Sequence, residues 1–149
     1  MNKKDFKLFD KAIKLINNDF YIDAVQVLRE LYDQTDDDDI KDDILYDIGL
    51  CYFKINDFND AIIYFERVID EYPNGIIKNS FKENEFGKIK DKCLYALINC
   101  LLSIDELKLA EKKFNEFDEK NDSYVMDRNG IKKSFKALAM QLIKKYKEL

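Results

Sequence analysis

Residues 43–73 constrain the fold more than any other stretch, because their apolar residues fall on two helical faces with one polar break between them. The first face comprises Leu45, Ile48, Gly49 and Tyr52, and the second comprises Ala61, Phe65 and Val68. Asn56 and Asp57 stand at the break, where short polar side chains suit a turn and a helix N-cap. Pro73 cannot continue a helix. The stretch therefore predicts two antiparallel helices.

Small and large side chains alternate along these two faces in a way that suits close helix packing. Gly49 and Ala61 are small where the helices must approach, and Tyr52 and Phe65 fill the adjacent space. Their spacing resembles a complete tetratricopeptide repeat, whose pattern has a large residue, then Leu-Gly, Tyr, Ala, Phe and Pro at these offsets. The resemblance implies helix pairs stacked into an α-solenoid that binds other proteins.

The same plan recurs on both sides of this unit. Residues 5–36 repeat it with Leu8, Ala12, Leu15, Ala24, Leu28 and Leu31, and residues 91–123 repeat it with Leu94, Leu97, Ile98, Leu101, Ala110, Phe114 and Phe117. Apolar residues recur once more at helical spacing over 129–147, where they predict a capping helix for the last repeat. We therefore expect a single all-α domain over 1–149: three helix pairs, the second over 42–74, and the cap.

The spacing between repeats shows where the chain departs from the pattern. Ala24 and Ala61 lie 37 residues apart and Ala61 and Ala110 lie 49 apart, against a family period of about 34. The larger excess defines an insert over 75–90, which carries the apolar residues Ile76, Ile77, Phe81 and Phe86. An insert this apolar is expected either to lengthen a helix or to fold back on the solenoid.

Composition restricts the function classes. The chain has a net charge of −5 and no basic stripe, which argues against nucleic-acid binding. It shows no uninterrupted apolar segment of signal-peptide or membrane-span length, so the complete chain would be cytoplasmic. If it was cut from a longer envelope protein, that expectation fails.

Catalysis finds no support in the motifs. The chain has no His, no CxxC pair, no phosphate-binding glycine loop and no GxSxG turn, so we expect neither an enzyme nor a cofactor. The aspartate run 36–39 lacks the ligand spacing of a calcium loop, so no metal is expected there. Cys51, Cys93 and Cys100 lie within apolar helix faces, where small buried packing residues are expected.

The resemblance also implies where a partner would bind. In this family the first helices of successive repeats line a concave groove, and the position after the leading large residue commonly points into it. That position holds Phe9, Tyr46 and Tyr95. The further residues expected in the groove are Asp10, Ile13, Asp43, Asp47, Leu50, Lys92 and Asn99.

An aromatic and acidic groove favours a protein or peptide partner with apolar anchors and flanking Lys or Arg. Some of these aromatic side chains could instead pack against neighbouring repeats or the insert. Co-chaperone members of the family bind a C-terminal carboxylate with Lys, Asn and Arg. Here the corresponding positions hold Phe9, Ile13, Asp47, Lys92 and Ala96, so such a receptor is disfavoured.

Two alternatives remain beside the groove adaptor. The ending of repeat two, Tyr72-Pro73-Asn74, resembles bacterial envelope-type repeat proteins, whereas size and acidity resemble secretion chaperones that hold hydrophobic clients. The other alternative is a structural component that forms homo-oligomers through the apolar insert. The sequence therefore predicts a non-enzymatic adaptor or scaffold and leaves these two functions open.

Overall fold

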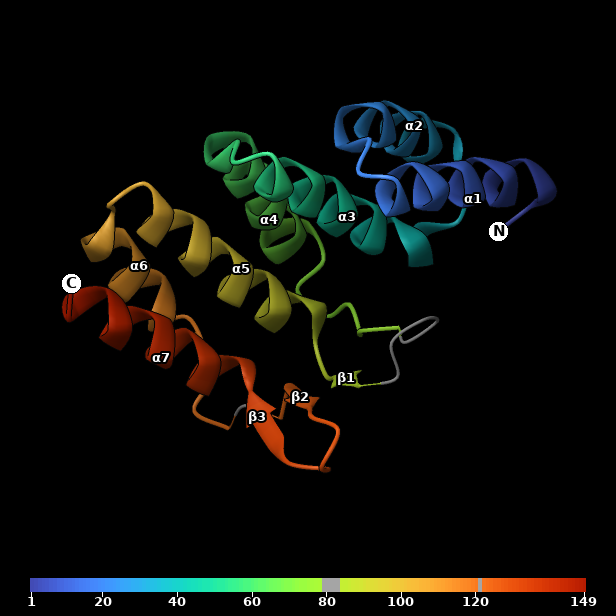
Figure 1. The fold of residues 1–149 in the computed structure, drawn as a ribbon. Helices are drawn as coiled ribbons and strands as arrows, with labels where there is room; N and C mark the ends of the chain where they lie inside the picture. Colours follow the sequence, from blue (N-terminus) through green and yellow to red (C-terminus); the bar gives the residue numbers. More distant parts are fainter. Residues whose placement is uncertain (79–83, 121) are drawn as a thin grey trace.

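The computed structural model describes residues 1–78, 84–120 and 122–149. Three successive helix pairs come first: α1 (Lys3–Asn17) with α2 (Tyr21–Gln34), α3 (Lys41–Lys54) with α4 (Phe58–Glu71), and α5 (Ile89–Ser103) with α6 (Leu107–Phe114). A short 3₁₀ helix, η1 (Asp38–Ile40), precedes α3, and the helix α7 (Phe135–Lys147) ends the fold. Figure 1 shows the pairs stacked in chain order from the N-terminal end to the C-terminal end.

The helices pack within their pairs, and the second helix of each pair also packs against the next part of the stack. α2 contacts α3, α4 contacts α5, and α7 covers both α5 and α6. One apolar core runs through the stack from Ala12 in the first pair to Ile143 in the last helix. The expected all-α solenoid of three helix pairs and a capping helix is confirmed.

The turn within each helix pair repeats the same backbone geometry. Asp19, Asn56 and Asp105 have positive φ angles of 63°, 62° and 61°, and each stands five residues before the pattern's alanine. Asp and Asn tolerate this left-handed conformation better than other non-glycine residues. In each turn the next residue donates its backbone N–H to a carbonyl five residues earlier: Phe20 to Leu15, Asp57 to Tyr52 and Glu106 to Leu101.

A second repeated feature is a buried aspartate in the first turn of the first helix of each pair, α1, α3 and α5. Asp5, Asp42 and Asp91 are at most 4% exposed, and each stands three residues before the leading Leu of its repeat. The Asp5 carboxylate accepts hydrogen bonds from Thr35 Oγ1 at 2.7 Å and Gln34 Nε2 at 3.1 Å. These hydrogen bonds, that from Thr35 above all, lower the pKa of Asp5.

The other two buried aspartates hold the chain at equivalent places. Asp91 Oδ2 accepts a hydrogen bond from Ser123 Oγ at 2.5 Å, and the Asp42 carboxylate lies directly against Gly75. Asp5 and Asp91 are thus hydrogen-bonded to residues at or beyond the end of the second helix, and Asp42 pairs with Lys78 beyond α4 at 3.4 Å. In each repeat the aspartate therefore joins the first turn of the leading helix to the segment around or after the end of the second helix.

A small antiparallel sheet, which the sequence did not predict, joins the insert to the segment between α6 and α7. Its strands β1 (Glu85–Phe86), β2 (Tyr124–Met126) and β3 (Lys132–Ser134) pair in that order. Val125 lies opposite Glu85 on one side and Lys133 on the other. The sheet lies beside the start of α5 and α7 in Figure 1, at one end of the third helix pair.

The sheet corrects one expected boundary. The last helix begins at Phe135 rather than near 129, because residues 132–134 extend as β3 and Ser134 caps the helix by accepting a hydrogen bond from the Ala137 N–H at 3.0 Å. Ile131, which lies within the range 129–147 expected for the capping helix, stands before β3 instead and is 55% exposed.

The insert folds back rather than lengthening a helix, as far as the structure describes it. Ile76 bridges Lys88, and the Ile77 N–H donates to the Gly87 carbonyl at 2.8 Å. Ile77 packs on the core, and the Phe86 ring stacks on Tyr124 at a centroid distance of 5.1 Å. Phe81 lies outside the described residues.

Candidate functional site

The predicted groove residues lie on the first helices of the three pairs. Phe9, Asp10 and Ile13 are on α1, Asp43, Tyr46, Asp47 and Leu50 are on α3, and Lys92, Tyr95 and Asn99 are on α5. All are half-buried except Asp10, which is exposed. Side chains of intermediate exposure on neighbouring helices suit contact with a partner, because they keep some surface while neighbouring groups hold their position.

The structure brings the central members of this set together. Lys92 Nζ lies 4.2 Å from the centre of the Tyr46 ring, and its charge acts on both Asp43 and Asp47. Lys92 also forms an ion pair of 2.6 Å with Glu85 of β1. We call Asp43, Tyr46, Asp47, Glu85 and Lys92 the Asp47 cluster.

Burial changes the acid–base properties of this cluster. Burial, and then the neighbouring charge of Asp43, raise the pKa of Asp47 to about 7. Burial likewise raises the pKa of Asp43 to about 6, although the Lys78 ammonium opposes that shift. The pKa of the Tyr46 hydroxyl is raised well above its ordinary value, mainly by burial. The net charge of the Asp47 cluster therefore changes near neutral pH.

The two aspartates differ in their partners. Asp43 Oδ2 lies 3.5 Å from Lys78 Nζ of the insert, which also lies 3.4 Å from Asp42 Oδ1. For Asp47, by contrast, the described part of the chain supplies neither a hydrogen bond nor an ion pair to the carboxylate. Asp47 is therefore the member of the cluster with capacity for an added cation.

The aromatic residues are supported from behind by rings of other helices. The Tyr46 ring lies 5.7 Å from the Phe65 ring of α4, and the Tyr95 ring lies 6.2 Å from the Phe135 ring of α7. Both tyrosines remain half-buried. Their packing fixes their orientation, and the exposed remainder is what a partner could contact.

The remaining predicted residues lie around this centre. Leu50 and Asn99 stand one helical turn beyond Tyr46 and Tyr95. Asp10 pairs with Lys14 of its own helix at 2.9 Å, so its charge is partly compensated within α1. Phe9 packs on the core from the α1 side, and Ile13 on the same helix is half-buried.

Sequence reasoning missed the contribution of the insert. Glu85 and Lys78 both reach the cluster from outside the repeats, one from β1 and one from the segment before it. Glu85 takes its place through pairing with Val125, which is far away in the sequence. No local pattern marks a strand of two residues, so this contact could not be found from spacing.

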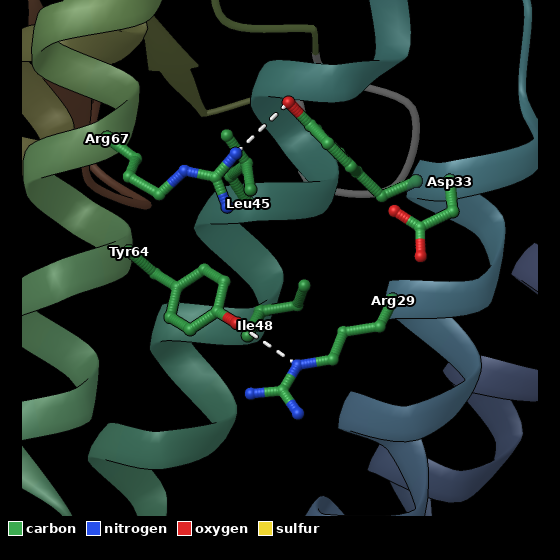
Figure 2. Close-up of a pocket in the computed structure, with 7 residues that line it drawn as sticks. Arg29, Asp33, Leu45, Ile48, Tyr64 and Arg67 are labelled. Carbon is green, nitrogen blue, oxygen red and sulfur yellow. Dashed lines mark hydrogen bonds between the residues drawn. The ribbon is translucent and has the colours of Figure 1, made fainter.

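Two cavities lie away from the predicted groove residues. One, of about 230 Å³, lies between α2 and α4 over α3 (Figure 2), and its lining residues are Arg29, Tyr32, Asp33, Leu45, Ile48, Tyr64 and Arg67. The other, of about 110 Å³, lies under the β2–β3 turn and is lined by Val125, Asp127, Ile131, Lys133 and Leu138.

Comparison with known families agrees with this architecture. Residues 43–75, which contain α4 and nearly all of α3, match the family model described as tetratricopeptide repeat. None of the curated proteins matches the chain. None of the described helices is both long and apolar enough to cross a membrane. The chain therefore contains a tetratricopeptide repeat over residues 43–75, and this repeat lies within a stack of three helix pairs.

Proposed function

We propose that this protein is a non-enzymatic interaction scaffold that holds a peptide or helix of a partner protein across the first helices of its repeats. The Asp47 cluster would accept a Lys or Arg side chain of the partner. Tyr46 and Tyr95 would contact apolar residues on either side of that cation. The observation that carries the proposal is the half-buried Asp47 carboxylate, which makes no ion pair or hydrogen bond within the described structure, although the charge of Lys92 acts on it from a distance.

The energetics of Asp47 favour a cationic ligand. A carboxylate taken partly out of water loses hydration, and the like charge of Asp43 adds repulsion. A guanidinium or ammonium group placed against it would replace the lost hydration and offset the repulsion. Hydrogen bonds to charged groups contribute about 1.5–3 kcal/mol when both partners are well oriented. A single basic side chain could therefore anchor a partner here.

The cations already present do not remove this capacity. Lys92 is held by Glu85 at 2.6 Å and by the Tyr46 ring, while Lys78 is divided between Asp42 and Asp43. The chain as a whole carries a net charge of −5, which also attracts basic partners at long range. Local and overall charge thus point to the same class of ligand.

The apolar insert gives less support to self-assembly. Ile77 packs on the core and Phe86 is stacked on Tyr124, so both are at least half-buried. Ile76, at 66% exposure, is the exposed apolar side chain of the described insert residues. One such side chain is a small contact surface. We therefore place the partner on the first helices and treat oligomerisation as an outcome to be tested.

The experiment is selection of ligands from a random peptide library with the full chain as bait, followed by affinity measurements by fluorescence anisotropy. Selected peptides should carry Lys or Arg beside apolar residues. Asp47→Asn should weaken binding about tenfold or more. Asp70→Asn, which removes an exposed charge from α4, should leave the affinity unchanged.

A second arm tests the aromatic contacts and the alternatives. The double variant Tyr46→Ala/Tyr95→Ala should lose peptide binding while it retains the helical circular dichroism signal of the native chain. Selection of purely hydrophobic peptides with no effect of Asp47→Asn would instead favour a chaperone for hydrophobic clients. A stable oligomer in native mass measurement, broken by Ile76→Asp, would favour self-assembly through the insert.

A further inference from the structure

The larger cavity forms a donor-rich site on the side of the second helices, away from the Asp47 cluster. Figure 2 shows Arg67 and Tyr64 extending from α4 and Arg29 extending from α2, with Leu45 and Ile48 of α3 behind them. The two guanidinium groups enter the space between the helices from opposite sides. This places two guanidinium groups around one cavity of about 230 Å³; Arg67 is ion-paired with Glu71, whereas Arg29 makes no ion pair with the described residues.

Arg29 is held in position by two tyrosine hydroxyl groups. Its Nε donates to Tyr64 Oη at 3.0 Å and its Nη2 donates to Tyr52 Oη at 2.7 Å. The guanidinium also lies 5.8 Å and 6.0 Å from the centres of these two rings. No carboxylate of the described residues lies within ion-pair distance of Arg29, and Asp60 acts on it only at longer range.

Arg67 is held in a similar way on the opposite side of the cavity. Its Nε donates to Glu71 Oε2 at 2.8 Å, and its Nη2 donates to Tyr32 Oη at 3.3 Å. Its guanidinium lies 5.3 Å from the centre of the Tyr32 ring and 5.8 Å from that of Tyr64. Both guanidiniums are thus oriented before any ligand binds, which reduces the entropy that binding would cost.

The hydrogen bonds of the site leave donors in excess. In the described structure, Nη1 of each arginine makes no hydrogen bond to the protein. The hydroxyl oxygen of Tyr64, which lines the cavity, already accepts from Arg29, so its O–H group remains available to donate. A ligand in this cavity would meet N–H and O–H groups from several directions, which is what the oxygen atoms of an anion require.

From this geometry we propose that the cavity binds one oxyanionic group, a carboxylate or a phosphate, carried by a peptide of a partner protein. The planar guanidinium matches both groups with paired hydrogen bonds. A peptide is the carrier that fits, because the cavity lies between the surface helices α2 and α4 and is lined beside the arginines by the half-buried rings of Tyr32 and Tyr64, which a peptide can contact. This site is separate from the proposed function and does not depend on it.

Asp33 sets how strongly an anion can bind. It is the carboxylate among the residues that line the cavity, and Figure 2 shows its side chain on the α2 side near Arg29. It is exposed and forms no ion pair with the described residues. Its negative charge opposes an anion in the cavity, so its removal should strengthen binding.

The test follows the arginine Nε–H signals of the full chain by NMR at fixed ionic strength. The probes are three capped tripeptides, Gly-X-Gly, in which X is phosphotyrosine, glutamate or glutamine. We expect saturable shifts of the Arg29 and Arg67 signals with phosphotyrosine, glutamate or both, and none with glutamine. The stronger of the two anions identifies whether a phosphorylated or an acidic segment is the natural ligand.

Variants make the assignment specific. Arg29→Gln or Arg67→Gln should weaken binding about tenfold or more, whereas Arg128→Gln, which removes an exposed positive charge from the β2–β3 turn, should not. Asp33→Asn should tighten binding several-fold, and because Asp33 is exposed this variant should fold even if an arginine variant does not. Linear shifts with every probe, equal loss in Arg128→Gln, or no gain in Asp33→Asn would overturn the proposal.

Discussion

Gly49 on α3 lies so close to Phe65 on α4 that a Cβ added to the glycine would stand 2.7 Å from Cε1 of the phenylalanine ring. The Phe65 side chain is fully buried, at 0% exposure, and the Tyr46 ring packs on it as well. The ring therefore has little room to move away. The predicted role of Gly49, a small residue where the two helices approach, is confirmed.

We expect Gly49→Ala to destabilise the protein. An added methyl group would force the Phe65 ring or the helices apart, which costs about 1–3 kcal/mol in a packed core. The higher helix propensity of alanine offsets up to about 1 kcal/mol of that loss. The free energy of unfolding, measured by urea titration, should therefore fall.

A double-mutant cycle with Phe65→Leu tests the mechanism. Because leucine leaves space beside residue 49, Gly49→Ala should cost less in the Phe65→Leu background than in the native chain. An equal cost in both backgrounds would mean that the close contact with Phe65 is not the reason.

Although its side chain is small, Ser123 should stabilise the folded chain through its hydrogen bonds. Its hydroxyl donates to Asp91 Oδ2 at 2.5 Å and accepts a hydrogen bond from the Lys88 N–H at 2.9 Å, so it joins α5 to the segment before β2. Ser123→Ala would leave the buried Asp91 carboxylate without this donor, a change that costs about 1–3 kcal/mol.

The matched comparison is Ser103→Ala. Ser103 lies near the end of α5, is exposed and donates to the carbonyl of Asn99 within its own helix. Its removal should change the unfolding free energy by no more than about 0.5 kcal/mol. Equal melting temperatures for the two variants would show that the contact between Ser123 and Asp91 contributes little.

The fold was predictable because each helix pair is defined by residues that lie close together in the sequence. Turn residues such as Asn56 and the small residues Gly49 and Ala61 each act within one helix pair, so spacing alone locates them. The small sheet was not predictable. Its strands hold two or three residues each, and β1 is defined by pairing with Val125 and Tyr124, far along the chain.

The candidate site was predictable only in part. Helical spacing placed Tyr46, Asp47 and Tyr95 on the first helices, which the structure shows. Spacing could not show that Glu85 holds Lys92, because that contact arises from the folded insert. The arginine cavity was also missed, since Arg29 and Arg67 belong to different repeats and meet only when the repeats stack.

The three cysteines should be unreactive in the folded protein. Cys51, Cys93 and Cys100 are at most 2% exposed and form no disulfide. Burial raises the pKa of Cys51 and of Cys100 to about 12 and that of Cys93 well above its ordinary value, so little thiolate is present at neutral pH. Ellman's reagent should label all three thiols in denaturant and none rapidly in native buffer. Rapid labelling of one thiol under native conditions would contradict this packing.

Asp47 should make stability depend on pH in an unusual direction. Its pKa is about 7 in the folded chain, above the ordinary value of 3.8 that applies when the chain is unfolded. Between these values the folded state binds more protons than the unfolded state, so the free energy of unfolding falls as pH rises from about 4 to about 7. Asp43, with a raised pKa of about 6, contributes with the same sign over a narrower range.

Asp47→Asn removes this contribution, so the variant should equal the native chain in stability at pH 4 and exceed it at pH 8. After allowance for solvent screening of a half-exposed group, we expect a gain on the order of 1 kcal/mol at the higher pH. Urea titrations at both pH values measure it, with Asp70→Asn, which removes an exposed carboxylate from α4, as the matched control. A variant less stable than the native chain at pH 8 would mean that Asp47 already has a cationic partner, and the proposed binding site would lose its main support.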